Sequence, residues 1–271
     1  DSFVLSNVRI VTPGRPTVDK GMIIVSQDKI VHAGAPTSFE VGYTEIDCTG
    51  LTAYPGFIDA YARYGLDLPT APNNAEAPTA TDGPLANFWH GNRKGVFADL
   101  DVSAHISTKA LQAMHKQGVT VAMLASGRGA FGGYTAVTAM IEAEKAVVLA
   151  PRLFQEVSFG SLGSGYPTST MARIALLRQL FIDGEHYLAH PPESGEAILS
   201  AIGDVAAGIQ RAVFAADSER EIQRALNLID EFGLKVTLYG SSAVWQHADA
   251  LKQRGISVIE QAGLPREPRR E

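Results

Sequence analysis

Short runs of β-forming residues, separated by turns, fill the first fifty positions of the chain. The runs cover residues 3–5, 8–11, 22–25 and 29–32, with a further candidate at 43–47. Turn-forming groups lie between them, among them Thr12-Pro13-Gly14 and Gly34-Ala35-Pro36. This close spacing predicts a small antiparallel sheet that forms part of a β-sandwich, and we assign residues 1–53 to it as a first domain.

Beyond residue 54, strand-like apolar runs alternate with helical patterns. We expect strands at 119–124, 146–149, 212–215, 236–239 and 256–259, and helices at 105–117, 169–188, 218–232 and 244–254. The third of these helices has the clearest boundaries, because Ser218 and Glu221 have the spacing of a capping box and Gly233 supplies the stop. This alternation is typical of parallel strands joined by helical crossovers, so residues 54–271 form a second, α/β domain.

Three stretches fit neither pattern. Residues 66–104, with Phe88-Trp89-His90 near their centre, form a long loop that is either functional or disordered. Residues 156–168 form a second, Gly/Ser-rich loop. Residues 126–133 follow a strand and precede a helix, where they either present backbone N–H groups to an anion or form a turn that needs glycine. The turn is the simpler interpretation.

Several short motifs occur once each along the chain, in an order that is found in a known protein family. The motifs are residues 6–11, the strand pair from Lys20-Gly21 to Gly34, residues 46–50, the block Tyr54-Pro55-Gly56-Phe57-Ile58-Asp59, and residues 117–120, 126–133, 166–171 and 177–179. Together they resemble the amidohydrolase superfamily, in its imidazolonepropionase-like branch. The resemblance implies a (β/α)8 barrel flanked by a β-sandwich built from both chain ends. The predicted fold is therefore α/β, a partial (β/α)8 TIM-type barrel of about six strands preceded by a small N-terminal β-sandwich-like region.

The resemblance also implies where metal ligands would lie. The family has a His-x-His pair after the first barrel strand, and further histidines end the fifth and sixth strands. In this sequence the pair falls on Tyr61 and Arg63, and the later positions fall on Phe214 and Tyr239. Phenylalanine has no donor atom, arginine keeps its positive charge, and a neutral phenol is a poor ligand. We therefore predict no metal at these positions and no other cofactor.

The remaining histidines offer one weaker metal candidate. His186 and His190 are four residues apart near the end of a predicted helix and could share a face. Positive charge near a helix C-terminus is the simpler interpretation of this pair.

The residues at the predicted barrel mouth form the candidate ligand-binding set. Its members are Asp59, Tyr61, Arg63, Phe214 and Tyr239. Arg63 could bind a carboxylate or a phosphate. The simpler alternative is an Arg63–Asp59 pair that fills the space a metal would take.

Composition excludes several classes of function. The chain has 271 residues and a formal net charge of −6, without the basic surface typical of nucleic-acid binding. Cys48 is the only cysteine, so no disulfide can form within the chain, and we expect this residue to be packed. No apolar stretch reaches the roughly 20 residues of a membrane helix. The first residue, Asp1, is compatible with a removed export leader, as in a periplasmic protein, or with a trimmed chain, and a cytoplasmic location stays open.

These observations favour a non-catalytic amidohydrolase-like protein that acts as a binding or scaffold subunit of a larger assembly. Its exposed sheet edges would be covered by a protein partner or by a missing C-terminal part. The alternative is a hydrolase of amide or cyclic amide C–N bonds with a relocated active site, and a third hypothesis is a small-molecule sensor.

Overall fold

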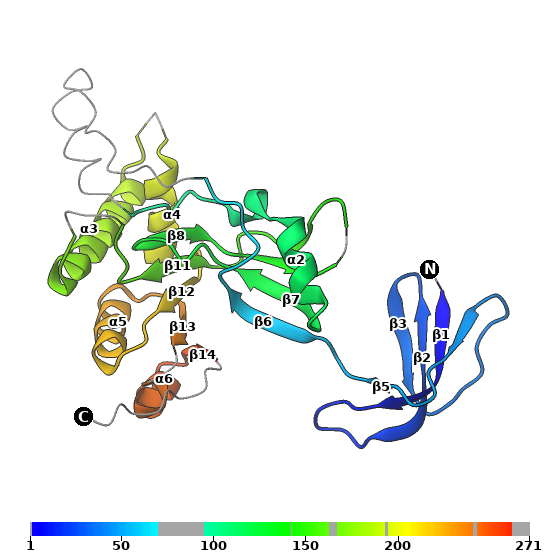
Figure 1. Cartoon of the computed structure of the whole chain (residues 1–271). Coiled ribbons are helices and arrows are strands. Elements are labelled where there is room, and N and C mark those ends of the chain that lie inside the picture. Colours follow the sequence, from blue (N-terminus) through cyan, green and yellow to red (C-terminus); the bar gives the residue numbers. More distant parts are fainter. Residues whose placement is uncertain are drawn as a thin grey trace, which may run out of the picture. The chain divides into compact units, whose positions relative to one another are not determined.

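The computed structural model describes residues 2–69, 95–141, 143–162, 167–192, 195–240 and 243–261. The aromatic triplet at 88–90 lies outside these ranges. Contacts divide the chain into two units, Asp1–Phe57 and Ile58–Glu271, which are drawn in Figure 1 and described separately below.

The first unit is built on one mixed sheet. The strands β1 (Phe3–Ile10), β2 (Val18–Ser26), β3 (Lys29–Gly34) and β4 (Thr44–Asp47) lie in the order β3-β2-β1-β4, and β5 (Thr52–Ala53) also pairs with β1. The first three strands are antiparallel, but β4 and β5 run parallel to β1. The expectation of a purely antiparallel sheet was wrong, because the connection after β3 carries the chain to the other edge of β1. The sandwich stays a prediction.

The second unit contains two sheets within the part of the chain that the structure describes. One has the order β10-β9-β7-β6, with β6 (Phe57–Ala62), β7 (Val119–Leu124), β9 (Ala136–Ala139) and β10 (Val147–Ala150). The other has the order β14-β13-β12-β11-β8, with β8 (Phe131–Tyr134), β11 (Gln155–Ser158), β12 (Ala212–Ala215), β13 (Val236–Gly240) and β14 (Ser257–Glu260). Strands β11 to β14 are parallel, as expected. The fold is therefore mixed α/β, and closure into a barrel stays a prediction.

Four of the helices in the described residues fall close to predicted positions, and α4 is an addition. The helices of this part of the chain are η2 (Val102–His105), α2 (Thr108–His115), α3 (Thr170–Ala189), α4 (Ala197–Ala206), α5 (Glu219–Phe232), η3 (Val244–His247) and α6 (Ala248–Gln253). The sequence analysis missed α4, because its residues are almost all apolar and most of them are buried, which leaves no polar face to mark the helical period. No described helix is both long and apolar enough to cross a membrane.

Close packing holds α3 against α4. A side-chain carbon added to Gly184 would lie 2.7 Å from the backbone nitrogen of Gly203, so only glycine permits this approach. Helix α5 begins with the expected capping box, in which Ser218 and Glu221 exchange side-chain and backbone hydrogen bonds, and it ends at Gly233 in the left-handed conformation. The main core of the unit contains large side chains from α3, α5 and the parallel strands, among them Leu177, Phe181, Phe214, Leu226 and Leu238.

Two loop assignments of the sequence analysis were wrong in part. The loop after β7 leads into the strand β8 rather than into a helix. Residues 155–158 form β11 rather than the start of a loop, because this segment pairs on one side with β12 and on the other with β8. A four-residue strand with a glutamate inside it has too little apolar pattern to be recognised.

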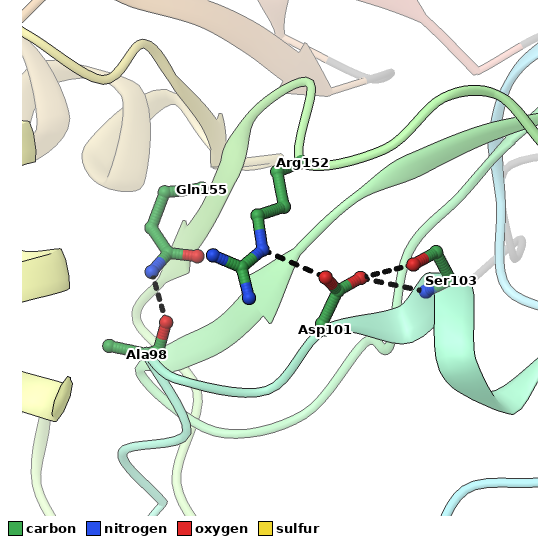
Figure 2. Close-up of polar contacts among 5 residues, drawn as sticks. All are labelled: Ala98, Asp101, Ser103, Arg152 and Gln155. Atoms are coloured by element: carbon green, nitrogen blue, oxygen red, sulfur yellow. Dashed lines mark hydrogen bonds and ion pairs between the residues drawn. The ribbon is translucent and has the colours of Figure 1, made fainter.

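Side-chain contacts fix the back of β11 (Figure 2). Gln155 donates from Nε2 to the carbonyl of Ala98 at 2.6 Å, and Arg152 Nε lies 2.8 Å from Asp101 Oδ2. The other oxygen of Asp101 accepts hydrogen bonds from the backbone N–H and the hydroxyl of Ser103, so Asp101 caps the N-terminus of η2. Segment 98–103 is thereby tied to the strand that carries Glu156.

Removing the Asp101 carboxylate should destabilise the second unit most at neutral pH. Desolvation alone would raise the pKa of Asp101, but hydrogen bonds from Ser103 and Arg152 outweigh it and lower that pKa. The charged form therefore stabilises the fold above the ordinary pKa of 3.8, and this contribution is lost as the pH falls through the lower folded value. We expect Asp101→Ala to lower the free energy of unfolding by about 1–2 kcal/mol, measured by urea denaturation at pH 7.

Asp101→Asn is the matched control, because an amide oxygen can still cap Ser103 while the charge is gone. We expect this variant to lose less stability than Asp101→Ala and to unfold with a flatter pH dependence below pH 4. Equal stability of Asp101→Ala and the unchanged protein at pH 7 would contradict the role given to this contact.

Candidate functional site

A cavity of about 590 Å³ lies at the C-terminal ends of the strands in the second unit. Its walls come from residues that follow successive strands: Arg63 and Tyr64 after β6, Gly127 and Gly129 after β7, residues 159–161 after β11, residues 216–217 after β12, and Gln261 after β14. This is the end of parallel strands at which α/β proteins place ligands.

A buried tyrosine–glutamate pair lies beneath the cavity. Tyr61 on β6 donates its phenolic hydrogen to Oε1 of Glu156 on β11, and both residues are almost fully buried. Burial raises the pKa of Tyr61, and the negative charge and hydrogen bond of Glu156 raise it further. Tyr61 therefore stays a neutral donor to the carboxylate at physiological pH.

The loop after β7 supplies the other partners of this carboxylate. The backbone N–H of Gly127 lies 3.2 and 3.0 Å from the two oxygens of Glu156. The hydroxyl of Ser126 shares its single hydrogen between Oε2 of Glu156, at 3.1 Å, and the carbonyl of Gly132, at 2.6 Å. A buried carboxylate is costly unless it is hydrogen-bonded, and here both oxygens have donors.

Arg63 lies over two stacked aromatic rings. The rings of Tyr61 and Tyr239 have centroids 3.9 Å apart and an interplanar angle of 24°. The guanidinium carbon of Arg63 lies 5.3 Å from the first centroid and 5.8 Å from the second, within the range of cation–π attraction. Desolvation alone would lower the pKa of Arg63, but Tyr61 and the charge of Glu156 raise it on balance. The cavity wall thus carries a positive charge held on an aromatic support.

Gly127 permits the close approach of Arg63 to the loop. Its φ is +67°, and a side-chain carbon at this position would lie 3.0 Å from Cδ and 3.2 Å from Nε of Arg63. A larger residue would be strained in backbone and would press on the arginine.

Asp59 has partners other than Arg63. Its carboxylate accepts from the backbone N–H of Tyr61 at 3.1 Å and from the hydroxyl of Tyr64 at 2.9 Å. Desolvation, together with the bond to Asp59, raises the pKa of Tyr64. The Arg63–Asp59 pair favoured from the sequence does not occur among the ion pairs of the described residues.

Four members of the predicted ligand-binding set line the cavity, and one does not. The four are Asp59, Tyr61, Arg63 and Tyr239. Phe214 is fully buried on the other face of its strand, where its ring centroid lies 5.2 Å from that of Phe159. Its register partner is Leu238, whereas Ala215 is paired with Tyr239. Successive side chains of a strand point to opposite faces, so Phe214 cannot share a face with Tyr239.

Among the described strands, the positions of Phe214 and Tyr239 differ from those that the resemblance implied. Strands β8, β9 and β10 pair antiparallel with their neighbours. Without them the order is β6, β7, β11, β12, β13 and β14, which places Phe214 on the fourth strand and Tyr239 on the fifth. Each is one strand earlier than expected.

Sequence reasoning missed Glu156. It named the loop at residues 126–133 as an anion-binding segment or a turn, but it did not find that Ser126 and Gly127 contact a carboxylate of the chain itself. One sequence feature could have pointed to Glu156. It is a glutamate between Gln155 and Val157, inside a segment short enough to be a buried strand. A charge at such a position is rare unless it is paired.

The residues at this site do not fit a divalent cation. Arg63 occupies one of the two positions at which the resemblance implied a metal-binding histidine, and it places a positive charge beside the stacked rings of Tyr61 and Tyr239. Within the ranges that the structure describes, no three His, Cys, Asp or Glu side chains form a group that could hold a metal ion. His186 and His190 have ring centroids 4.7 Å apart at the end of α3, but they belong to no such group.

Neither the protein-family models nor the curated proteins compared with the sequence match it. The structure is similar to that of an amidohydrolase from Thermotoga maritima MSB8, with a TM-score of 0.73, 16% identity, and coverage of 96% of this chain and 70% of that one. Two weaker matches carry no argument. They are a prolidase complexed with N-methylphosphonate-L-proline (TM-score 0.40, 14% identity, 98% and 79% covered) and a beta-aspartyl dipeptidase from Fervidobacterium islandicum AW-1 (TM-score 0.41, 13% identity, 98% and 66% covered). The first match shows an amidohydrolase-like fold.

Tyr61→Phe should destabilise the second unit, because it removes a hydrogen bond to a buried charge. We expect the free energy of unfolding to fall by about 1.5–3 kcal/mol at pH 7, measured by chemical denaturation. The raised pKa of Tyr61 stabilises the fold below the ordinary value of 10.0, and this contribution is lost as the pH rises through the higher folded value. The unchanged protein should therefore lose stability more steeply above pH 10 than the variant does.

Tyr54→Phe is the matched control for this substitution. Tyr54 is exposed, so its loss of a hydroxyl should change stability by less than about 0.5 kcal/mol. If Tyr61→Phe were as mild as Tyr54→Phe, the Glu156 carboxylate would not depend on the phenol.

Proposed function

We propose that this chain is a metal-free, non-catalytic amidohydrolase-like protein that binds a small ligand bearing a carboxylate or a phosphate in the cavity at the strand ends. Arg63 is the anion-binding group, Tyr61 and Tyr239 support it, and Asp59 contributes a polar wall. The observation that carries this proposal is the guanidinium of Arg63 on the cavity wall, stacked on two tyrosines and bound to no carboxylate among the described ion pairs.

The state of Glu156 supports a binding role over a catalytic one. A general base needs a lone pair within reach of the substrate proton. Both oxygens of Glu156 accept hydrogen bonds from Tyr61, Ser126 and Gly127, and the residue is almost fully buried. The described cavity lining contains no histidine and no cysteine, so Ser158 and Ser161 have no imidazole or thiolate neighbour there to activate them.

The metal-free character rests on the side chains themselves. We propose that Tyr61 and Arg63 stand where relatives of the imidazolonepropionase-like branch have two metal-binding histidines. Arginine keeps its charge at every physiological pH and repels a cation.

Purified protein should therefore contain far less than one zinc, iron or manganese ion per chain. The measurement is elemental analysis after exhaustive dialysis against a metal-free buffer, with a zinc-supplemented sample treated in the same way. About one retained ion per chain in either sample would contradict a metal-free site.

We further propose that the chain works as a subunit of a larger assembly. Apolar side chains on the first unit are exposed, among them Ile30, Val31, Ile46 and Leu51, and β14 forms one edge of its sheet. Exposed apolar surface and open strand edges are usually covered by a partner or by further chain.

The second candidate function is a hydrolase of C–N bonds in amides or cyclic amides. The fold similarity to the Thermotoga amidohydrolase favours it, although fold alone does not determine chemistry. Turnover of an amide, hydantoin or dipeptide panel that is abolished by Arg63→Gln would establish this candidate in place of the first.

Arg63→Gln should weaken ligand binding while leaving the fold intact. We expect the affinity for small carboxylates and phosphate monoesters, such as N-acetyl amino acids and glycerol phosphate, to fall about tenfold to a hundredfold, because a charge-assisted hydrogen bond is lost. Isothermal titration calorimetry measures the affinity, and thermal unfolding checks the fold. Arg128→Gln is the matched control, because this arginine lies in the same loop, between Gly127 and Gly129, but is not among the residues that line the cavity. Equal affinities in both variants would exclude Arg63 as the anion-binding group.

A further inference from the structure

A second cavity, of about 540 Å³, lies at the opposite ends of the parallel strands. The geometry points to a binding site for a small dianion of the phosphate or dicarboxylate class, held by Arg211 and Lys235. Arg211 directly precedes β12, and Lys235 directly precedes β13. Both residues line the cavity, together with Arg254 and Asp230.

The strand register places the two cations side by side. Ala212 is the partner of Val236 in the parallel pair, so the residues just before them are also neighbours. The backbone N–H of Ala212 donates to the carbonyl of Lys235 at 3.0 Å, which fixes this alignment. Neighbouring strands lie roughly 4.8 Å apart, close enough for both side chains to contact one small ligand.

The only carboxylate in the described cavity wall is already neutralised. Arg254 donates from Nε and Nη2 to the two oxygens of Asp230, at 2.9 and 2.8 Å. Among the ion pairs formed by the described residues, none includes Arg211 or Lys235. The guanidinium of Arg211 lies 5.8 Å from the ring centroid of Phe154, a contact that leaves its N–H donors for a ligand. Two uncompensated cations thus gather in one concave region of a protein whose net charge is −6.

The shape and donors of the cavity indicate the class of ligand. Side-chain carbons added at Gly233 and Gly255, which both line the cavity, would meet no atom within 4 Å, so this wall is open. The planar fork of an arginine suits the paired oxygens of phosphate or carboxylate, and lysine adds a compact point charge. A doubly charged anion matches the two cations.

These cations could instead serve only the ends of helices. Helices α5 and α6 end beside the cavity, at Gly233 and Arg254. Lys235 lies against the turn after α4, where a side-chain carbon added to Gly208 would be 3.2 Å from Cε of the lysine. A helix C-terminus carries about half a negative charge, which offsets only part of the two full positive charges. A role limited to helix ends predicts that removing the cations lowers stability and that phosphate has no specific effect.

The experiment titrates the full chain with inorganic phosphate, pyrophosphate and succinate at constant ionic strength, with sodium chloride as the balancing salt. Backbone amide shifts of Gly233 and Gly255 report binding at this cavity, and thermal unfolding reports stabilisation. We expect saturable shifts at both glycines and a higher unfolding temperature with at least one dianion. The phosphate and succinate arms identify which class of anion the site prefers.

Arg211→Gln/Lys235→Gln should weaken this binding at least tenfold. Arg220→Gln/Lys29→Gln is the matched control, because it removes the same charge from exposed positions outside the cavity, and Arg63→Gln should leave the site unaffected. If the first double variant does not fold, Lys235→Gln alone serves, with an expected threefold or greater loss. Shifts no larger than those caused by sodium chloride, or equal binding by variant and control, would overturn the proposal.

Discussion

Placing a carboxylate inside this fold constrains everything around it. Glu156 lies beneath the cavity in a strand of only four residues, and a charge buried there without partners would cost several kcal/mol. Tyr61, Ser126 and Gly127 supply donors from two other strand ends, so β6, β7 and β11 must keep their relative positions for the charge to be tolerated. The same requirement fixes the ring of Tyr61, on which Tyr239 stacks and over which Arg63 lies. The arginine that faces the cavity is therefore oriented indirectly by the glutamate below it.

The alternation of side chains along the strands separates this polar cluster from the main core. Gln155 and Glu156 are neighbours in sequence, yet one donates to the carbonyl of Ala98 and the other accepts from Tyr61 across the site. Phe214 and Tyr239 also point to opposite faces. The register pairs Phe214 with Leu238, and both belong to the main core, whereas Tyr239 lines the cavity. A shift of one residue in β12 would place the phenyl ring of Phe214 in the cavity, and a shift in β11 or β13 would place the carboxylate of Glu156 or the phenol of Tyr239 in the core. The register is thus strongly specified by chemistry on both faces.

The sequence predicted those features that leave a local signature. The capping box at Ser218, the stop at Gly233, the parallel strands β12 to β14 and the presence of Tyr61 and Arg63 at one strand end all follow from short-range patterns. Features that depend on distant pairing were missed or wrong. Helix α4 has no polar face, β4 runs parallel to β1 because of a long connection, and Phe214 was assigned to the wrong face. Glu156 is bonded to Tyr61, 95 positions earlier in the chain, and no local pattern carries that information.

The two ends of the parallel strands carry different balances of charge. At the C-terminal end, Arg63 faces a wall that also contains Asp59, Asp217 and Glu221, so an anion binding there must tolerate nearby carboxylates. At the N-terminal end, Asp230 is paired with Arg254. Arg211 and Lys235 therefore leave this cavity with an excess of positive charge. The strands therefore separate a mixed-charge cavity from a basic one.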